Sequence, residues 1–214
     1  MIYDNHRFPW TAALEESWPA IRAELDRVQN EEFISWPNVN MYKGTWELFG
    51  LFGFGKRHDL NCERCPETAR AVERIPGMTT AVFSAMEPGT YLPPHRGATD
   101  AVLRCHLGVD VPEDCGIRVE QQKVPWQEGR CVIFDDTAEH EVWNRGDRRR
   151  INLIIDFWKP FRFPGRRLKR LKQRVAVKMN LKRSDVLEFI NKEHARQRAV
   201  YESRQKGNSE SPEQ

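Results

Sequence analysis

The feature that most constrains the fold is a series of short segments between residues 79 and 158 in which apolar and polar side chains alternate. Such alternation is typical of β-strands that bury one face. Turn-forming stretches such as Glu87-Pro88-Gly89 and Asn144-Arg145-Gly146-Asp147 separate the segments. Many short strands at this spacing predict a sandwich, jelly roll or barrel, with a pocket between two sheets. The predicted strands span residues 79–86, 101–109, 116–121, 130–136, 140–144 and 150–158.

Helices are predicted before this strand region. Residues 11–29 carry apolar side chains at helical spacing, and Thr11 is suited to cap the first turn. Pro19 interrupts the pattern; because proline is favoured in a first helical turn, the helix is alternatively expected to begin there. A second, short helix is predicted over residues 66–75, ended by the Pro-Gly pair that follows. The aromatic and glycine-rich stretch 39–55 suits one or two strands with a turn.

The character of the chain changes after residue 160. We predict a domain over residues 1–160, a strongly basic helical extension over 161–206 and a disordered tail over 207–214. Between residues 166 and 175 the arginines and lysines alternate with Leu and Val. This pattern suits contact with an anionic membrane surface or an acidic partner, and equally a solvated helix face.

Composition excludes several classes of protein. The net charge of the 214-residue chain is only +3, which does not by itself indicate nucleic acid as a partner. No run of about 18 apolar residues occurs, so no transmembrane helix is expected. The N-terminus has no apolar signal region, which predicts a cytoplasmic location. An odd number of cysteines, five, in such a chain favours free thiols over a disulfide framework.

Cys62 and Cys65 form a Cys-x-x-Cys pair with His58 nearby. A structural zinc site usually takes its four ligands from two such pairs, and no second pair occurs in the sequence. A redox pair of the thioredoxin type follows a strand, which the preceding residues do not resemble. We interpret the pair as part of a loop that caps the helix beginning near Pro66; metal binding and a disulfide are the alternatives.

Three histidines, His95, His106 and His140, lie in the strand region. Non-heme iron oxygenases hold their metal through two histidines and one carboxylate. In jelly-roll enzymes of this type the carboxylate stands two positions after the first histidine. His95 and His140 have a suitable separation, but position 97 is a glycine. The usual triad is therefore not predicted.

The motifs PHRG (94–97), LRCHLG (103–108), FDDTAEHEVWN (134–144) and RINLIIDFW (150–158) occur in the order seen in one family. With their surroundings, from about residue 79 to 160, they resemble the aspartyl/asparaginyl β-hydroxylases. The resemblance implies an iron(II)- and 2-oxoglutarate-dependent dioxygenase that uses O2. It also implies a mainly β fold, a jelly-roll or cupin-like double-stranded β-helix with flanking N- and C-terminal helices. Members of this family bind iron through two histidines and carry a glycine in place of the carboxylate.

The resemblance also assigns roles to individual residues. His95 and His140 are expected to bind the iron and so to be catalytic. Arg150 is expected to pair with the distal carboxylate of 2-oxoglutarate, since a guanidinium matches a carboxylate through two hydrogen bonds. Ser84 is expected to donate a hydrogen bond to the same carboxylate, and Met86 to line that pocket.

Three further residues are expected near the pocket. Trp46 and His106 match positions beside the cosubstrate, and Arg104 matches a substrate-binding position. Arg104 and His106 are two apart, so they share one face of a strand. For His106 the alternative is a satisfied core histidine. For Arg150 the alternative is a one-residue slip, because Arg148 and Arg149 stand beside it; alternation puts Arg148 on the same face and Arg149 on the opposite one.

Acidic residues near these motifs receive structural interpretations. Asp135 and Asp136 are expected to be turn residues that end a strand, although Asp136 alternatively orients a histidine from outside the metal's ligand sphere. Asp100, five positions after His95, is a poorer ligand candidate.

The predicted reaction is hydroxylation of an unactivated C–H bond, first of all at the β-carbon of an aspartyl or asparaginyl residue in a peptide or on a carrier. Val102 stands where the family often has an arginine, which weakens the expectation of a clamp for an aspartyl carboxylate. The alternatives are hydroxylation of a lipid A acyl chain and a non-catalytic cupin-like module that holds a metal or an acid. DNA binding by the basic extension is a weaker alternative, and nucleic acid is not expected as a partner.

Overall fold

The computed structural model describes residues 1–28, 32–97, 99–160, 195, 198–199 and 202. The chain divides into a unit of Met1–Arg170 and a unit of Leu171–Gln214. The predicted basic extension (161–206) and tail (207–214) therefore lie outside the described residues, apart from four positions of the extension. Within the described ranges, no helix combines the length and the apolar character that a membrane span needs.

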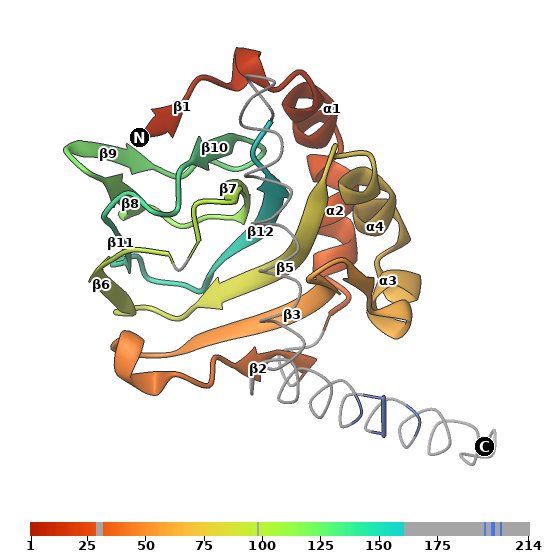
Figure 1. Cartoon of the computed structure of the whole chain (residues 1–214). Coiled ribbons are helices and arrows are strands. Elements are labelled where there is room, and N and C mark those ends of the chain that lie inside the picture. The colour runs from red at the N-terminus through yellow and green to blue at the C-terminus, as the bar shows by residue number, and fades with distance from the viewer. Residues whose placement is uncertain (29–31, 98, 161–194, 196–197, 200–201, 203–214) are drawn as a thin grey trace, which may run out of the picture. The chain divides into compact units, whose positions relative to one another are not determined.

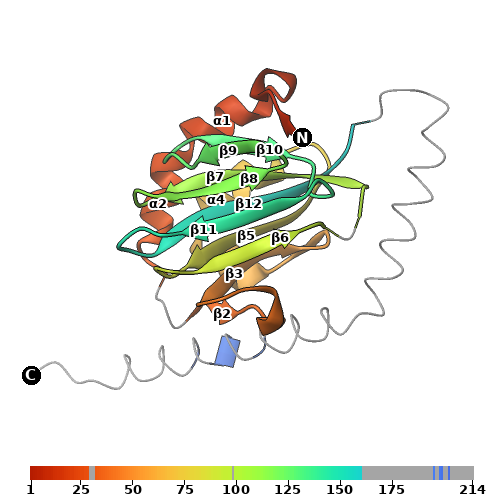
Figure 2. The ribbon, with the colours of Figure 1, turned by 90° about the vertical axis from the view of Figure 1, so that its left-hand side faces the viewer.

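Two antiparallel sheets form the first unit (Figures 1 and 2). The larger sheet has the order β1-β10-β7-β12-β5-β3-β2, with β4 paired to β3, and the smaller has the order β6-β11-β8-β9. The strands of the larger sheet are β1 (Ile2–Tyr3), β2 (Ile34–Ser35), β3 (Trp46–Gly53), β4 (Lys56–Arg57), β5 (Met78–Met86), β7 (Val102–Asp110), β10 (Cys131–Phe134) and β12 (Arg150–Trp158). Those of the smaller sheet are β6 (Tyr91–His95), β8 (Cys115–Val119), β9 (Gln122–Pro125) and β11 (His140–Asn144). The predicted mainly β, two-sheet fold is confirmed.

Each of the six strands predicted between residues 79 and 158 matches an observed strand within a few residues. Within this region the sequence does not predict β6 or β9, and β6 contains Pro93 and Pro94. The strand β6 lies at the edge of the smaller sheet: it forms a ladder with β11, and Tyr91 also forms an isolated bridge with Lys43. The missing N–H groups of Pro93 and Pro94 therefore interrupt no ladder on the outer side. The edge position explains why a Pro-Pro sequence forms a strand here.

The helices are α1 (Trp10–Glu16), α2 (Trp18–Leu25), α3 (Asp59–Arg64) and α4 (Pro66–Glu73), with 3-10 turns η1 (Asn5–Arg7) and η3 (Val39–Met41). The prediction of one helix over 11–29 is wrong, because the chain breaks at Ser17. The alternative is confirmed, since Pro19 lies in the first turn of α2. Thr11 is not a cap: it lies inside α1, and its hydroxyl donates to the Phe8 carbonyl at 2.9 Å.

The larger sheet has two buried faces, and each belongs to a different core. On one face, side chains such as Phe49, Phe83 and Leu153 pack with Leu14 and Ile21 of the helices. Figure 1 shows α1, α2, α3 and α4 on that side and the smaller sheet on the other. On the second face, residues of both sheets form a separate apolar cluster. The polar residues buried between the sheets therefore lie inside the sandwich.

The Cys-x-x-Cys pair is structural. Cys62 lies within α3 rather than in a loop, and its thiol donates to the Leu51 carbonyl at 3.3 Å. Burial raises the pKa of Cys62 to about 11 and that of Cys65 to about 12, so both thiols are protonated at neutral pH. All five cysteines are free. Across the described ranges, no group of three or more His, Cys, Asp or Glu side chains is arranged to hold a metal ion.

A buried carboxylate joins two of the helices. Glu24 of α2 is 2% exposed. It accepts hydrogen bonds from the backbone N–H groups of Glu67 and Thr68 at 2.7 and 2.8 Å, and from the Thr68 hydroxyl at 2.6 Å. The N–H groups in the first turn of α4 have no partner within the helix, so Glu24, which lies 43 residues before Glu67 in the sequence, acts as the cap of α4.

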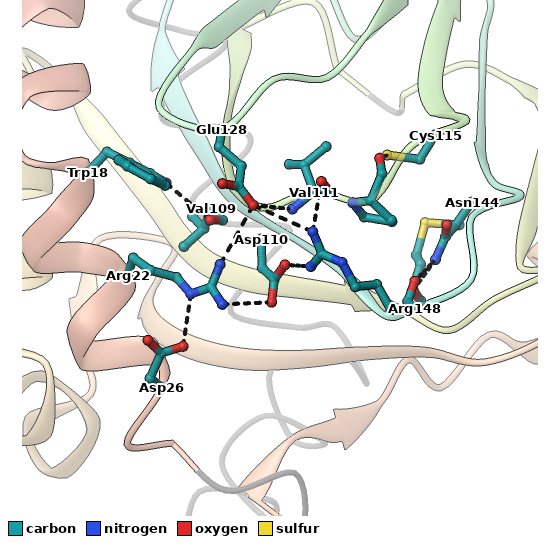
Figure 3. Close-up of polar contacts among 12 residues, drawn as sticks. Trp18, Arg22, Asp26, Val109, Asp110, Val111, Cys115, Glu128, Asn144 and Arg148 are labelled. Atoms are coloured by element: carbon teal, nitrogen blue, oxygen red, sulfur yellow. Dashed lines mark hydrogen bonds and ion pairs between the residues drawn. The ribbon is translucent and has the colours of Figure 1, made fainter.

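An ion-pair network fixes α2 against the larger sheet (Figure 3). Arg22 of α2 lies 3.2 Å from Asp110 at the end of β7, and Arg148 contacts the same carboxylate. The Trp18 indole donates to the Val109 carbonyl at 3.0 Å. Exposed ion pairs contribute little each, so we assign this network a role in orientation.

The Glu24 cap generates a stability prediction. Replacing Glu24 by Gln removes the charge and one acceptor oxygen, which leaves a donor of α4 unsatisfied. We expect the free energy of unfolding in a urea titration to fall by about 1–2 kcal/mol. Glu16→Gln, on the exposed end of α1, is the matched control and is expected to change it by less than about 0.5 kcal/mol. Equal effects of the two substitutions would contradict the role of Glu24.

Candidate active site

The pairing of β6 with β11 places two histidines opposite each other. His95 and His140 are direct partners in the antiparallel register. Their ring centroids lie 4.0 Å apart, with the ring planes inclined by 53°. His140 is 2% exposed, whereas His95 is partly exposed. The sheet therefore brings together two imidazoles that are far apart in the sequence.

Each imidazole is oriented by a backbone carbonyl two residues earlier. The Nδ1 of His95 lies 2.8 Å from the Pro93 oxygen, and the Nδ1 of His140 lies 2.9 Å from the Ala138 oxygen. A carbonyl only accepts, so each Nδ1 carries a proton, and in the neutral form of either ring the lone pair lies on Nε2. Burial lowers the pKa of His140 to about 4, so this ring is neutral at pH 7. Neutral rings with unprotonated Nε2 atoms are the form that binds metal ions.

Gly97 lies where a third, acidic ligand is expected in other iron oxygenases. Its N–H donates to the Asp136 carbonyl at 2.7 Å. A Cβ atom on residue 97 would lie 1.7 Å from the Asp136 Oδ2, so the side chain of Asp136 occupies this space. The Asp136 Oδ1 lies 3.5 Å from the His140 Nε2. The expectation that Asp136 merely ends a strand is therefore incomplete, because its side chain reaches the histidine pair.

Arg150 is the largest fully buried side chain and carries a charge. It is 1% exposed, and no carboxylate among the described residues forms an ion pair with it. Its Nη2 contacts the Met86 sulfur, and its Nε has no hydrogen-bond partner. Burial lowers its pKa to about 10, which still leaves it charged at pH 7. A buried cation with free donors is the arrangement that an anionic ligand completes.

Two residues that the sequence analysis did not single out hold Arg150 in place. The guanidinium lies over the Trp126 ring, 4.5 Å from its centroid. With the Asn152 amide turned by 180°, its oxygen accepts from the Trp126 Nε1 at 3.2 Å and from the Arg150 Nη1 at 3.1 Å. Asn152 is two residues after Arg150 on β12, so the two side chains share a face, and strand alternation in the sequence could have predicted this. The sequence gives no signal that Trp126, which lies between β9 and β10, reaches Arg150.

Ser84 and Trp46 lie beside this arginine. Ser84 pairs with Asn152 in the register of β5 and β12, and Met86 pairs with Arg150. The Trp46 indole donates to the Ser84 hydroxyl at 2.9 Å, which leaves the hydroxyl proton available for an acceptor. Ser84, Met86, Trp46 and Arg150 therefore meet as the resemblance implied.

His106 connects the two halves of the site. Its ring stacks on Trp126 and meets Phe134 edge-on, with centroid distances of 5.7 and 5.2 Å, and Phe134 also contacts His140 at 5.2 Å. His106 is buried, and neither ring nitrogen has a hydrogen-bond partner. This finding argues against a satisfied core histidine. Burial, with Arg104 and Arg150 nearby, lowers its pKa well below the usual value, so the ring is neutral.

Arg104 reaches the same interior from β7 but has different neighbours. Its Nε and Nη2 donate to the two Asp156 oxygens at 2.8 and 3.0 Å, and its Nη1 donates to Asp136 at 2.7 Å.

One alternative to Arg150 in the sequence, Arg148, lies in the surface network of Figure 3. The other, Arg149, pairs with Glu47 at 2.7 Å, and its guanidinium lies 4.4 Å from the centroid of the Phe33 ring. Both alternatives are thus held by carboxylates, which favours Arg150 as the arginine for an anionic ligand; its role stays a prediction.

A comparison with known proteins bears on this site. A sequence profile described as aspartyl/asparaginyl beta-hydroxylase matches residues 15–160. The chain belongs to this family. The predicted resemblance is confirmed and extends further toward the N-terminus than the motifs on which it rested.

Two relatives are named for different activities. An ornithine lipid ester-linked acyl 2-hydroxylase of Rhizobium tropici is 46% identical over 176 residues, which cover 77% of this chain and 63% of that protein. The human aspartyl/asparaginyl beta-hydroxylase is 36% identical over 164 residues, which cover 72% of this chain and 22% of that protein. The chain thus spans less than two thirds of the length of either relative.

A solved structure supports the fold. An oxidoreductase of the 2OG-Fe(II) oxygenase family from Burkholderia pseudomallei superposes with a TM-score of 0.50 at 12% identity, over 65% of this chain and 77% of that one. At this identity the likeness concerns the fold alone.

The residues present fit the groups that the family implies. The Nδ1 atoms of His95 and His140 are taken by backbone carbonyls, so the two Nε2 atoms would hold iron(II). Arg150, which lacks an acidic partner among the described residues, and the Ser84 hydroxyl offer donors for a carboxylate of 2-oxoglutarate. The individual roles of these residues stay predictions.

The environment of His106 predicts a pH dependence of stability. Its folded-state pKa lies well below the usual value, whereas in the unfolded chain it is about 6.5. Below pH 6.5 the unfolded state binds a proton that the folded state does not, so the free energy of unfolding falls by up to about 1.4 kcal/mol per pH unit. We expect His106→Leu to reduce this slope in urea titrations between pH 7 and 5. His6→Leu, on an exposed histidine, is expected to leave it unchanged.

Because the Asp136 side chain lies against Gly97, we expect that position 97 accepts no larger residue without a loss of stability. In Gly97→Ala the new methyl group must displace Asp136, which Arg104 holds, so we expect a loss of about 1–3 kcal/mol in the free energy of unfolding. Gly53→Ala is the control, because a Cβ atom there meets no atom within 4 Å. If both variants unfold at the same urea concentration, the packing of Asp136 against Gly97 is not as described.

Proposed function

We propose that this protein is an iron(II)- and 2-oxoglutarate-dependent hydroxylase that acts on the acyl chain of a membrane lipid. The observation that carries the catalytic part is the cross-strand histidine pair beside a buried arginine that has no acidic partner among the described residues. Together with O2, these cofactors supply the oxidation that converts a C–H bond into C–OH while 2-oxoglutarate becomes succinate and carbon dioxide.

The protein's own groups bind and orient in this proposal. The backbone carbonyls of Pro93 and Ala138 hold the Nδ1 atoms of the two imidazoles, so Nε2 is the atom of each ring that would bind the iron. Arg150 and Ser84 bind the distal carboxylate of 2-oxoglutarate, and Met86 lines its methylene groups. The aromatic rings of Trp126 and Phe134 keep this part of the sandwich dry, which strengthens the arginine–carboxylate interaction.

The choice of a lipid rests on the relative from Rhizobium tropici. The identity of 46% covers 77% of this chain and exceeds the 36% shared with the human peptide-hydroxylase relative. Val102 is a second argument, since it supplies no charge on the face that it shares with Arg104. The first expectation from the sequence, an aspartyl or asparaginyl β-carbon, becomes the second candidate. A cytoplasmic location and contact of the basic extension with an anionic surface stay predictions.

The experiment is a substrate screen with purified protein, iron(II), 2-oxoglutarate and O2. We expect a lipid with an ester-linked acyl chain to gain the mass of one oxygen, with stoichiometric succinate. An aspartyl peptide that gains this mass while lipids do not would establish the second candidate. Absence of O2-dependent succinate with every substrate would indicate a non-catalytic module.

Variants test the assigned residues. We expect His95→Ala to abolish product formation, because one ligand is lost. We expect Arg150→Lys to raise the KM for 2-oxoglutarate at least about tenfold, because an ammonium lacks the planar pair of donors. Arg148→Lys, two positions earlier in the surface network, is the matched control. An unchanged KM in Arg150→Lys would refute the assignment of Arg150.

A further inference from the structure

The interior of the sandwich contains two arginines with opposite charge environments. Arg150 has no acidic partner among the described residues, whereas Arg104 has two, Asp136 and Asp156. The His140 Nε2 lies 3.5 Å from Asp136, so the histidine pair is next to the arginine that is already paired. The site therefore has a cationic side, at Arg150, and a side where positive charge is already neutralised, at Arg104 and the histidine pair.

The pairing of Arg104 with Asp156 is built into the sheet. The two residues are direct partners in the register of β7 and β12, so their side chains share the inner face. Asp156 takes two parallel hydrogen bonds, from Nε and Nη2, the geometry in which a guanidinium binds a carboxylate best. The side chains of Arg104 and Asp156 are 27% and 15% exposed, so water screens the pair only partly.

Asp136 completes the neutralisation. It accepts from the remaining terminal nitrogen, Nη1, at 2.7 Å, and its side chain is 7% exposed. Two carboxylates on one guanidinium give this group of three a formal charge of −1. An anion that approaches Arg104 has to displace a carboxylate and is repelled by the other, whereas an apolar or neutral group meets no such opposition.

We infer that the substrate side of this site selects a reacting carbon that lies next to an uncharged group, and that Asp156 is the residue that determines this specificity. The inference rests on the proposed function and narrows it: the substrate class is an ester or amide of a fatty acid rather than a free acid or an aspartyl side chain. Asp156 acts through Arg104 and is a positioning residue.

The test compares the binding of two ligands that have the same acyl chain and differ in the charge of the group next to C2. Octanoic acid and methyl octanoate carry the same chain, but only the acid has a charge beside C2. Their Kd values are measured anaerobically by calorimetry with iron(II) and 2-oxoglutarate present, so Arg150 is occupied and no turnover occurs. We expect wild-type protein to bind the ester at least about tenfold more tightly than the acid, and Asp156→Asn to lower this ratio about tenfold.

Two further variants separate charge from structure. Asp156→Glu keeps the carboxylate and is expected to retain the wild-type ratio. Asp135→Asn is the matched control, since Asp135 pairs with Lys159 at 2.7 Å rather than with Arg104. Equal binding of acid and ester by wild-type protein, binding of neither, or an unchanged ratio in Asp156→Asn would overturn the inference. If 2-oxoglutarate does not bind in the same titrations, the result counts against the proposed function. If the protein hydroxylates lipids but Asp156→Asn leaves the ratio of the Kd values for acid and ester unchanged, the result counts against the inference alone.

Discussion

The burial of Arg150 is the constraint on which the rest of the site depends. A charge taken out of water without a carboxylate partner lowers the stability of a fold unless other groups compensate for it. Here the compensation is partial: an aromatic face, an amide oxygen and a thioether surround the guanidinium, and its Nε remains unsatisfied. A site that keeps such a group is arranged for an anionic ligand, and the dicarboxylate cosubstrate of this family supplies one.

Arg104, the second arginine of the interior, differs from Arg150 because carboxylates compensate its charge. Arg104 is neutralised by acids from a neighbouring strand and from the turn after β10. Charge-assisted pairs of this kind orient a side chain strongly but withdraw its donors from ligands. The two ends of the site therefore differ in charge: the end at Arg150 attracts an anion, and the end at Arg104 does not. The histidine pair lies next to Asp136, at the end that does not attract an anion.

The helices support this site from behind. They cover the outer face of the larger sheet, whose inner face carries Ser84, His106 and Arg150. The Glu24 carboxylate of α2 accepts hydrogen bonds from two backbone N–H groups of α4, which connects these two helices on the outer face. The polar interior is therefore confined to the space between the sheets, where water is excluded and electrostatic interactions are strong.

The sequence by itself determined the strand pattern, the mainly β class and, through its motifs, the family and the residues that meet at the site. Periodicity determines the strand pattern and the class because alternation is a local property of the chain. The family and the site residues follow instead from the resemblance of the motifs. Only the tertiary structure decided the strand β6 at a sheet edge, the cap from Glu24 and the contact of Trp126 with Arg150. It alone also decided that, among the described residues, Arg104 has acidic partners and Arg150 has none, because the partners of a charged side chain come from strands and turns that are distant in sequence.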